Sequence, residues 1–175
     1  GYYDIQPDII TYGKIIGGGM PVGAYGASKE IMAHVAPEGP VYQAGTLSAN
    51  PVAMAAGYAA LQELAKPGVY ENLAAKTEGF TQRIEDYAKS KGWPLRIPRI
   101  GSIFWFAFSE ERIIRADQIH AEGIERFKIL HHELLQRGIY LGPSGYEVGF
   151  VSTAHTEEDL KGAADVICQV LDIVF

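Results

Sequence analysis

The sequence has 175 residues, of which 47% are hydrophobic and 21% charged, and its formal net charge at pH 7 is -6. This length allows one large domain or two small units, and the acidic balance argues against a nucleic-acid surface or an anionic membrane surface as the main partner. The single cysteine, Cys168, cannot form an internal disulfide, which is typical of a reducing cytoplasm, and no apolar run is long enough to cross a bilayer.

The first predicted elements surround a lysine. Residues 9–12, Ile-Ile-Thr-Tyr, are β-branched and aromatic, which predicts a short buried strand that ends at Gly13. Lys14 follows, and residues 17–19 are glycines that let the main chain approach a ligand or another strand. Residues 21–28 predict a second short strand. Because the sequence starts without methionine and reaches this loop almost at once, we expect it to begin within a larger fold.

A loop and a helix are expected next. Residues 37–51 predict a loop whose end is a helix start, with Asn50 as the N-cap and Pro51 in the first helical position. Small residues dominate 52–64, so we expect this helix to pack closely against its neighbours. Lys-Pro-Gly at 66–68 breaks the pattern and is the best candidate for a domain boundary.

The second half of the chain alternates between helices and strands. Apolar residues three and four apart predict amphipathic helices that end at Gly92 and Gly138. Residues 99–109 form a nearly continuous apolar and aromatic run, typical of a buried strand, and residues 139–143 and 149–153 predict two more short strands.

The final helix has a recognisable start. Thr156 and Asp159 resemble a capping box, with aspartate in place of the usual glutamate or glutamine. Cys168 is expected to pack within the helix that follows. His131 and His132 are adjacent on a predicted helix and therefore point in different directions, so we expect no metal site there. The mixed order of elements predicts an α/β or α+β fold.

The setting of Lys14 allows several interpretations. A phosphate-binding P-loop fails, because Ile15 follows the Gly13-Lys14 pair and Asp8 stands where the first glycine is needed; the dinucleotide pattern fails at Val22. A surface lysine on a flexible turn remains possible on residue type alone. A lysine that forms a Schiff base is the other alternative, since such an amine needs partial desolvation and an open backbone around it.

Three segments carry a resemblance to a known family. They are GKIIGGGMPVGA at 13–24, YQAGTLSANP at 42–51 and YEVGFVSTAHTEEDL at 146–160. The chain resembles the class III aminotransferases, which use pyridoxal 5'-phosphate, and within them the glutamate-1-semialdehyde 2,1-aminomutases. The resemblance implies the C-terminal portion of a fold-type I transferase of the α/β class. Residues 1–66 would complete the large cofactor-binding domain, and residues 67–175 would form the linking helix and a small α+β domain.

The resemblance also implies roles for particular residues. Lys14 corresponds to the lysine that bonds to pyridoxal phosphate and moves protons at the substrate carbon. Thr46 corresponds to a threonine that reaches the cofactor phosphate of the partner subunit in a homodimer with shared active sites; a turn-stabilising threonine is the structural alternative. Further residues are implied to line the active site, namely Tyr42, Gln43, Ser144 and Glu147. For Glu147 a solvated loop carboxylate is the structural alternative.

The implied reaction is the conversion of glutamate 1-semialdehyde, a small-molecule substrate, to 5-aminolevulinate for tetrapyrrole synthesis in the cytoplasm. Its cycle includes the pyridoxamine phosphate form of the cofactor. The family's aspartate for the pyridine nitrogen, its phosphate loop and its carboxylate site lie upstream of these residues, so we expect the chain alone to be inactive. The alternatives are another class III ω-aminotransferase and, in a different class, a noncatalytic association domain.

Overall fold

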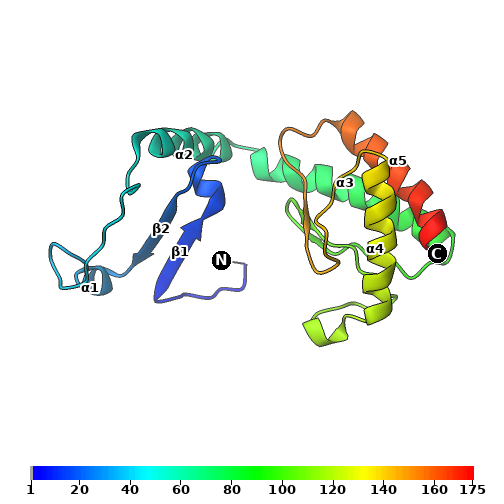
Figure 1. Ribbon diagram of the computed structural model, residues 1–175, viewed down its shortest axis with the longest axis horizontal. Coiled ribbons are helices and arrows are strands. Elements are labelled where there is room, and N and C mark those ends of the chain that lie inside the picture. The colour runs from blue at the N-terminus through cyan, green and yellow to red at the C-terminus, as the bar shows by residue number, and fades with distance from the viewer. Residues whose placement is uncertain (1) are drawn as a thin grey trace. The chain divides into compact units, whose positions relative to one another are not determined.

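The computed structural model describes residues 2–175 and divides into two compact units (Figure 1). The N-terminal unit reaches to Pro67, and the C-terminal unit is Gly68–Phe175. No helix in the described part of the chain is long and apolar enough to span a membrane.

The N-terminal unit is built on a pair of antiparallel strands, β1 (Ile9–Gly13) and β2 (Gly23–Ala27). Their register pairs Ile9 with Ala27 and Gly13 with Gly23. A short 3-10 turn, η1 (Lys14–Gly17), leaves the end of β1. Both strands predicted from the sequence are confirmed, but the burial expected for residues 9–12 is wrong within this unit, because every residue of β1 is exposed.

Two helices complete this unit. Helix α1 (Lys29–Met32) was not predicted; the Ser28 hydroxyl caps it by accepting a hydrogen bond from the Ile31 amide at 3.3 Å. Helix α2 (Pro51–Leu64) starts where predicted, because Asn50 Oδ1 accepts hydrogen bonds from the next two backbone amides of the helix, at 3.1 and 3.2 Å. Helix α2 lies against η1, at one end of the β1–β2 pair (Figure 1).

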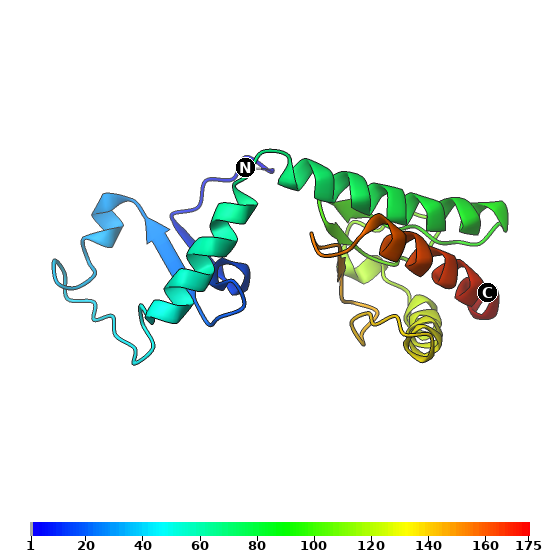
Figure 2. The same cartoon turned by 90° about the horizontal axis from the view of Figure 1, so that it is seen from above.

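The C-terminal unit contains three long helices, α3 (Val69–Ser90), α4 (Ala121–Gln136) and α5 (Glu157–Val174). Helix α5 contacts both α3 and α4, and α4 runs across the other two, since it is seen end-on in Figure 2. The Thr156–Asp159 capping box that begins α5 is confirmed, with Asp159 Oδ2 accepting from the Thr156 amide at 2.9 Å.

A small antiparallel sheet completes this unit, in the order β3 (Arg99–Ile100), β4 (Ile103–Phe104) and β5 (Gly149–Phe150). A short 3-10 turn, η2 (Ala116–Gln118), precedes α4.

Two strand predictions were wrong. The run at 99–109 is not one strand: it folds back after Ile100, where Gly101 adopts a φ of 56°, and forms the β3–β4 hairpin. A side-chain pattern reports burial and does not reveal a turn within an apolar run. Residues 139–143 form no strand, although Ile139 and Leu141 pack against the core. The strand predicted at 149–153 is reduced to the two residues of β5.

The core of the C-terminal unit is continuous and draws on all three helices and the sheet. The largest fully buried apolar side chains are Ile84, Ile97, Leu130, Leu134, Ile167, Val170 and Leu171. Phe104 of β4 packs edge-on against Phe80 and Phe106, with ring centroids 5.3 and 5.8 Å away. Cys168 is buried in α5, as predicted, and burial raises the pKa of its thiol.

Candidate active site

Lys14 stands where β1 ends and η1 begins. Its side chain is exposed, and its backbone has a φ of 54°, in the left-handed region that residues other than glycine rarely adopt. The turn after it is held by two backbone hydrogen bonds of 3.0 Å, from Gly18 N–H to the Ile15 carbonyl and from Met20 N–H to the Gly17 carbonyl. The lysine is therefore the first residue of a closed turn and not part of a loose loop.

Helix α2 lies directly against this turn. A Cβ atom built on Gly18 would come within 3.0 Å of the Ala56 carbonyl oxygen and would lie 3.2 Å from the Ala60 methyl group. Gly19, in contrast, has open space where a side chain would be. The turn thus packs against α2 at Gly18, whereas the space beside Gly19 is open to a ligand.

The loop that carries Tyr42, Gln43 and Thr46 is also ordered. Tyr25 of β2 donates a hydrogen bond to Gln43 Oε1 at 2.5 Å, which ties the loop to the strand. Thr46 is exposed in a turn, next to the hydrogen bond from Ser48 N–H to the Gly45 carbonyl at 2.9 Å. Sequence reasoning missed Tyr25, for which only its place in the second strand was visible.

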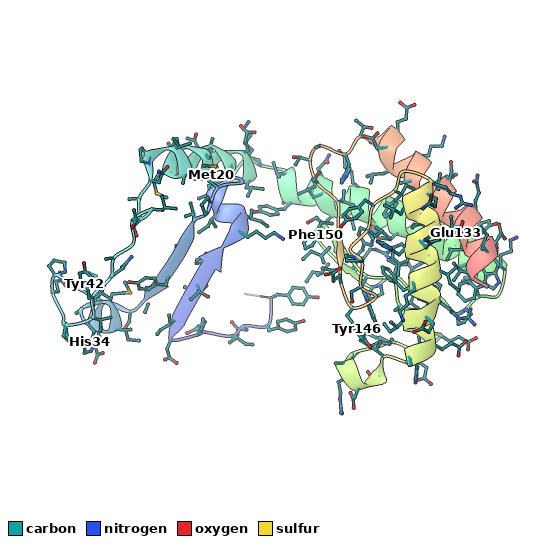
Figure 3. All side chains as sticks on the ribbon, in the orientation of Figure 1. Met20, His34, Tyr42, Glu133, Tyr146 and Phe150 are labelled. Carbon is teal, nitrogen blue, oxygen red and sulfur yellow. The ribbon has the colours of Figure 1, made fainter. Side chains whose placement is uncertain are left out.

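The structure does not bring Tyr42 to the lysine turn. Figure 3 shows Tyr42 beside α1. Met20 lies beside α2, at the other end of the β1–β2 pair, and its backbone N–H donates a hydrogen bond to the carbonyl of Gly17, the last residue of η1. Tyr42 is also strongly exposed. Within the N-terminal unit, Tyr42 therefore lies in surroundings different from those of the lysine turn.

Ser144 and Glu147 lie together in the C-terminal unit. The Ser144 amide donates to Glu147 Oε2 at 3.2 Å, and the Glu147 amide donates to the Ser144 carbonyl at 3.0 Å. The same carboxylate lies so close to Gly142 that a Cβ there would overlap it. Glu147 is thus both exposed and held by its own loop, which accommodates either of its two interpretations.

Trp105 fixes this loop from the sheet side. Its indole Nε1–H donates to the Gly145 carbonyl at 2.7 Å, and a Cβ on Gly145 would lie 3.0 Å from Ile124 and 3.2 Å from Phe127 of α4. Sequence reasoning treated Trp105 as core; its signal was the indole N–H, which needs a partner when a tryptophan is partly buried.

The arrangement around Lys14 fits pyridoxal phosphate. It offers a primary amine at a strand end, with no side chain at Gly13 or Gly19 to keep a planar ring from the backbone. A hydroxyl such as that of Thr46, in a turn with backbone amides, is a suitable donor to phosphate oxygens. Two cavities of the C-terminal unit, about 580 and 360 Å³ in volume, contain none of the predicted site residues. No group of three or more His, Cys, Asp or Glu in residues 2–175 could hold a metal ion.

A family model described as Aminotransferase class-III matches residues 1–171. The chain belongs to the class III aminotransferases. The fold-type I portion expected from the resemblance is confirmed by the same match and by the solved structures of this class.

Three solved class III relatives illustrate the range of similarity. A β-phenylalanine aminotransferase from Variovorax paradoxus is 30% identical with a TM-score of 0.86, and an ω-transaminase from Sphaerobacter thermophilus is 29% identical with a TM-score of 0.83. The alignments cover 98% and 97% of this chain, and 40% and 39% of those proteins. A glutamate-1-semialdehyde aminomutase from Pseudomonas aeruginosa PAO1 is 22% identical with a TM-score of 0.80, over 99% of this chain and 41% of that protein.

This chain therefore spans about two-fifths of the length of these class III enzymes. Pyridoxal phosphate is the cofactor of the class: one similar structure is a transaminase with PLP bound, and another is an aminomutase in complex with PMP, the amine form. The cofactor predicted from the sequence is confirmed at this level.

Proposed function

We propose that this chain carries the covalent lysine and part of the substrate site of a longer enzyme that transfers amino groups with pyridoxal phosphate. The observation that carries the proposal is the position of Lys14, an exposed amine in a left-handed residue at the end of β1, on a turn closed by hydrogen bonds. A surface lysine needs no such backbone, because strained residues persist only where their surroundings enforce them.

The residues of this chain divide the work. Lys14 Nζ is the amine that would bond to the cofactor, and the same nitrogen would accept a proton at the substrate carbon and return it. When bound, pyridoxal phosphate supplies a ring that draws electrons away from the bond being broken. Thr46 Oγ1 donates a hydrogen bond to the phosphate of the partner subunit's cofactor in a homodimer. Four further residues line the shared site: Tyr42, Gln43, Ser144 and Glu147.

Two alternative reactions are proposed for the longer enzyme. Transfer between two different substrates, as by an ω-aminotransferase, is supported by the identities of 29% to an ω-transaminase and 30% to a β-phenylalanine aminotransferase. Intramolecular transfer from glutamate 1-semialdehyde to 5-aminolevulinate, the reaction of a cytoplasmic tetrapyrrole pathway, is supported by the motifs at 42–51 and 146–160. The 22% identity to an aminomutase supports the fold alone. The identities of 29% and 30%, which exceed the 22% to the aminomutase, favour transfer between two different substrates.

Borohydride reduction tests the role of the lysine. The longer enzyme, incubated with pyridoxal phosphate and then reduced, is expected to carry the cofactor on the peptide that contains Lys14, and a Lys14→Ala variant is expected to lose the label there. Label on a different lysine, or none, contradicts the assignment and favours a noncatalytic association domain. The isolated 175-residue chain is expected to show no turnover.

A single-substrate assay separates the two versions. An aminomutase converts glutamate 1-semialdehyde to 5-aminolevulinate with no second substrate, whereas an ω-aminotransferase needs an amine donor and an oxo-acid acceptor. Product from the semialdehyde alone, at a rate that an added oxo acid does not raise, selects the aminomutase. Amine-to-oxo-acid transfer, with no 5-aminolevulinate formed, selects the aminotransferase.

A further inference from the structure

Helix α2 makes a second close approach to the lysine turn, at Gly57. A Cβ atom built on Gly57 would overlap the carbonyl oxygen of Ile16, and it would lie 3.5 Å from the Cα of Gly17. Gly57 is buried, and so is Gly17 opposite it. Because the obstacle is a main-chain oxygen, no side-chain rotation could relieve the overlap.

Helix preference does not explain a glycine here. Glycine weakens a helix interior relative to alanine, and the other residues around position 57 are mostly alanine. Two other helical glycines show the contrast: Gly79 of α3 and Gly162 of α5 have nothing within 4 Å of an added Cβ. Gly57 is therefore distinguished by its contact with the lysine turn.

We propose that Gly57 is a positioning residue for Lys14: it lets α2 and η1 touch backbone to backbone and so sets where the lysine amine stands. This inference rests on the proposed role of Lys14. The turn is continuous from Lys14 to Ile16, and the Gly18 N–H to Ile15 carbonyl hydrogen bond makes it move as a unit. A displacement of Ile16 therefore also displaces Lys14, two positions earlier in the same turn.

The left-handed backbone of Lys14 fits this role. Its φ of 54° is unfavourable for a lysine, so contacts around the turn must hold it there. An added Cβ would overlap a main-chain oxygen at two places between the turn and α2: at Gly57 it would meet Ile16, and at Gly18 it would meet Ala56. A methyl group at 57 forces the turn away from the helix by at least several tenths of an ångström, and it alters the contacts that hold Lys14.

The test compares Gly57→Ala with Gly79→Ala in the longer enzyme, because both replace a helical glycine by alanine. Two quantities are measured: the rate at which pyridoxal phosphate becomes borohydride-trapped on Lys14, and the affinity for pyridoxamine phosphate, which binds without bonding to a lysine. Gly57→Ala is expected to slow trapping by about 10- to 100-fold, since small misplacements of a reacting group have effects of this size. Affinity for pyridoxamine phosphate is expected to stay within about 3-fold, well below a tenfold change. Gly79→Ala is expected to change neither.

Each result has a definite meaning. Loss of both quantities in Gly57→Ala, with a lowered melting temperature, overturns positioning in favour of a general packing role. Unchanged trapping in Gly57→Ala also overturns it, while the role of Lys14 survives. Absence of Lys14 trapping in the unsubstituted enzyme instead contradicts the proposed function itself. If Gly57→Ala does not fold, Gly18→Ala decides, because an added Cβ there would overlap the main-chain oxygen of Ala56 on the same helix; slower trapping supports the proposal, and wild-type trapping overturns it.

Discussion

The two units of this chain differ sharply in how they bury apolar side chains. In the C-terminal unit, α3, α4, α5 and the sheet enclose one continuous core. Among the described residues of the N-terminal unit, Ala53 is the only buried hydrophobic side chain; the other buried positions are Gly17 and Gly57. Large apolar side chains there are exposed instead, including Ile5, Ile9, Ile10, Tyr12, Ile15, Val52 and Tyr58.

The well-packed unit and the unit that contains the candidate catalytic lysine are therefore different parts of the chain. A two-stranded sheet that no helix covers is marginal on its own, because it removes little apolar surface from water. Lys14 stands in that marginal unit, held by main-chain contacts between η1 and α2. The unit with the core instead contributes a pinned loop with Ser144 and Glu147. The position of Lys14 is thus set by main-chain contacts of the turn. Little buried apolar surface stabilises the unit that contains it.

The largest expected effect comes from producing the units separately. Residues 68–175 are expected to unfold in a cooperative transition with urea, followed by circular dichroism, because their core is complete. Residues 1–67 are expected to show no such transition, because their apolar side chains remain in water. A cooperative transition in the N-terminal piece alone would remove the contrast on which the comparison rests.

A substitution within α5 sharpens the comparison further. Ile167 is 0% exposed and Ile173 of the same helix is 52% exposed. Ile167→Ala is expected to lower the free energy of unfolding by about 2–5 kcal/mol, from lost apolar burial and the cavity left behind. Ile173→Ala, the matched control, is expected to change it by roughly 0.5 kcal/mol or less. Equal losses measured by urea unfolding would show that the exposed face of α5 is covered in solution.

Sequence reasoning succeeded where neighbouring residues decide the structure. Asn50 and Pro51 start α2, and Thr156 with Asp159 starts α5, because a side chain caps amides two or three residues away. The strands on either side of Lys14 were equally visible, since β-branched and aromatic residues end at glycine there. These local rules located the lysine turn without any tertiary information.

Contacts between distant residues lay beyond that reasoning. Trp105 and Gly145 are 40 positions apart, so nothing near either residue reveals that the indole holds the loop of Glu147. The close approach of Gly57 to Ile16 also joins distant residues: the glycine was visible as part of a small-residue helix, but its partner was not. The hairpin turn at Gly101 was missed for another reason, because a continuous apolar pattern does not reveal a turn within it.

The smallest expected effect is a pH dependence confined to the C-terminal unit. Hydrogen bonds from the Thr156 hydroxyl, and then from its backbone amide, lower the pKa of Asp159. A lowered pKa in the folded state means that the ionised carboxylate stabilises the fold above its ordinary pKa, near 3.8, and that this stability is lost as the pH falls through the folded value. Asp159→Asn is therefore expected to lower the urea midpoint of residues 68–175 at pH 7, and by less at pH 3.

Glu157→Gln is the matched control for this prediction, because it removes a negative charge from the same first turn of α5 without breaking the capping box. Its effect reports only the attraction between an acidic side chain and the helix N-terminus, which is small at an exposed site and weakened by salt. If the two variants lose the same stability with the same pH dependence, the charge alone accounts for Asp159. A larger loss in Asp159→Asn that persists in high salt assigns the difference to the two hydrogen bonds with Thr156, which salt screens little.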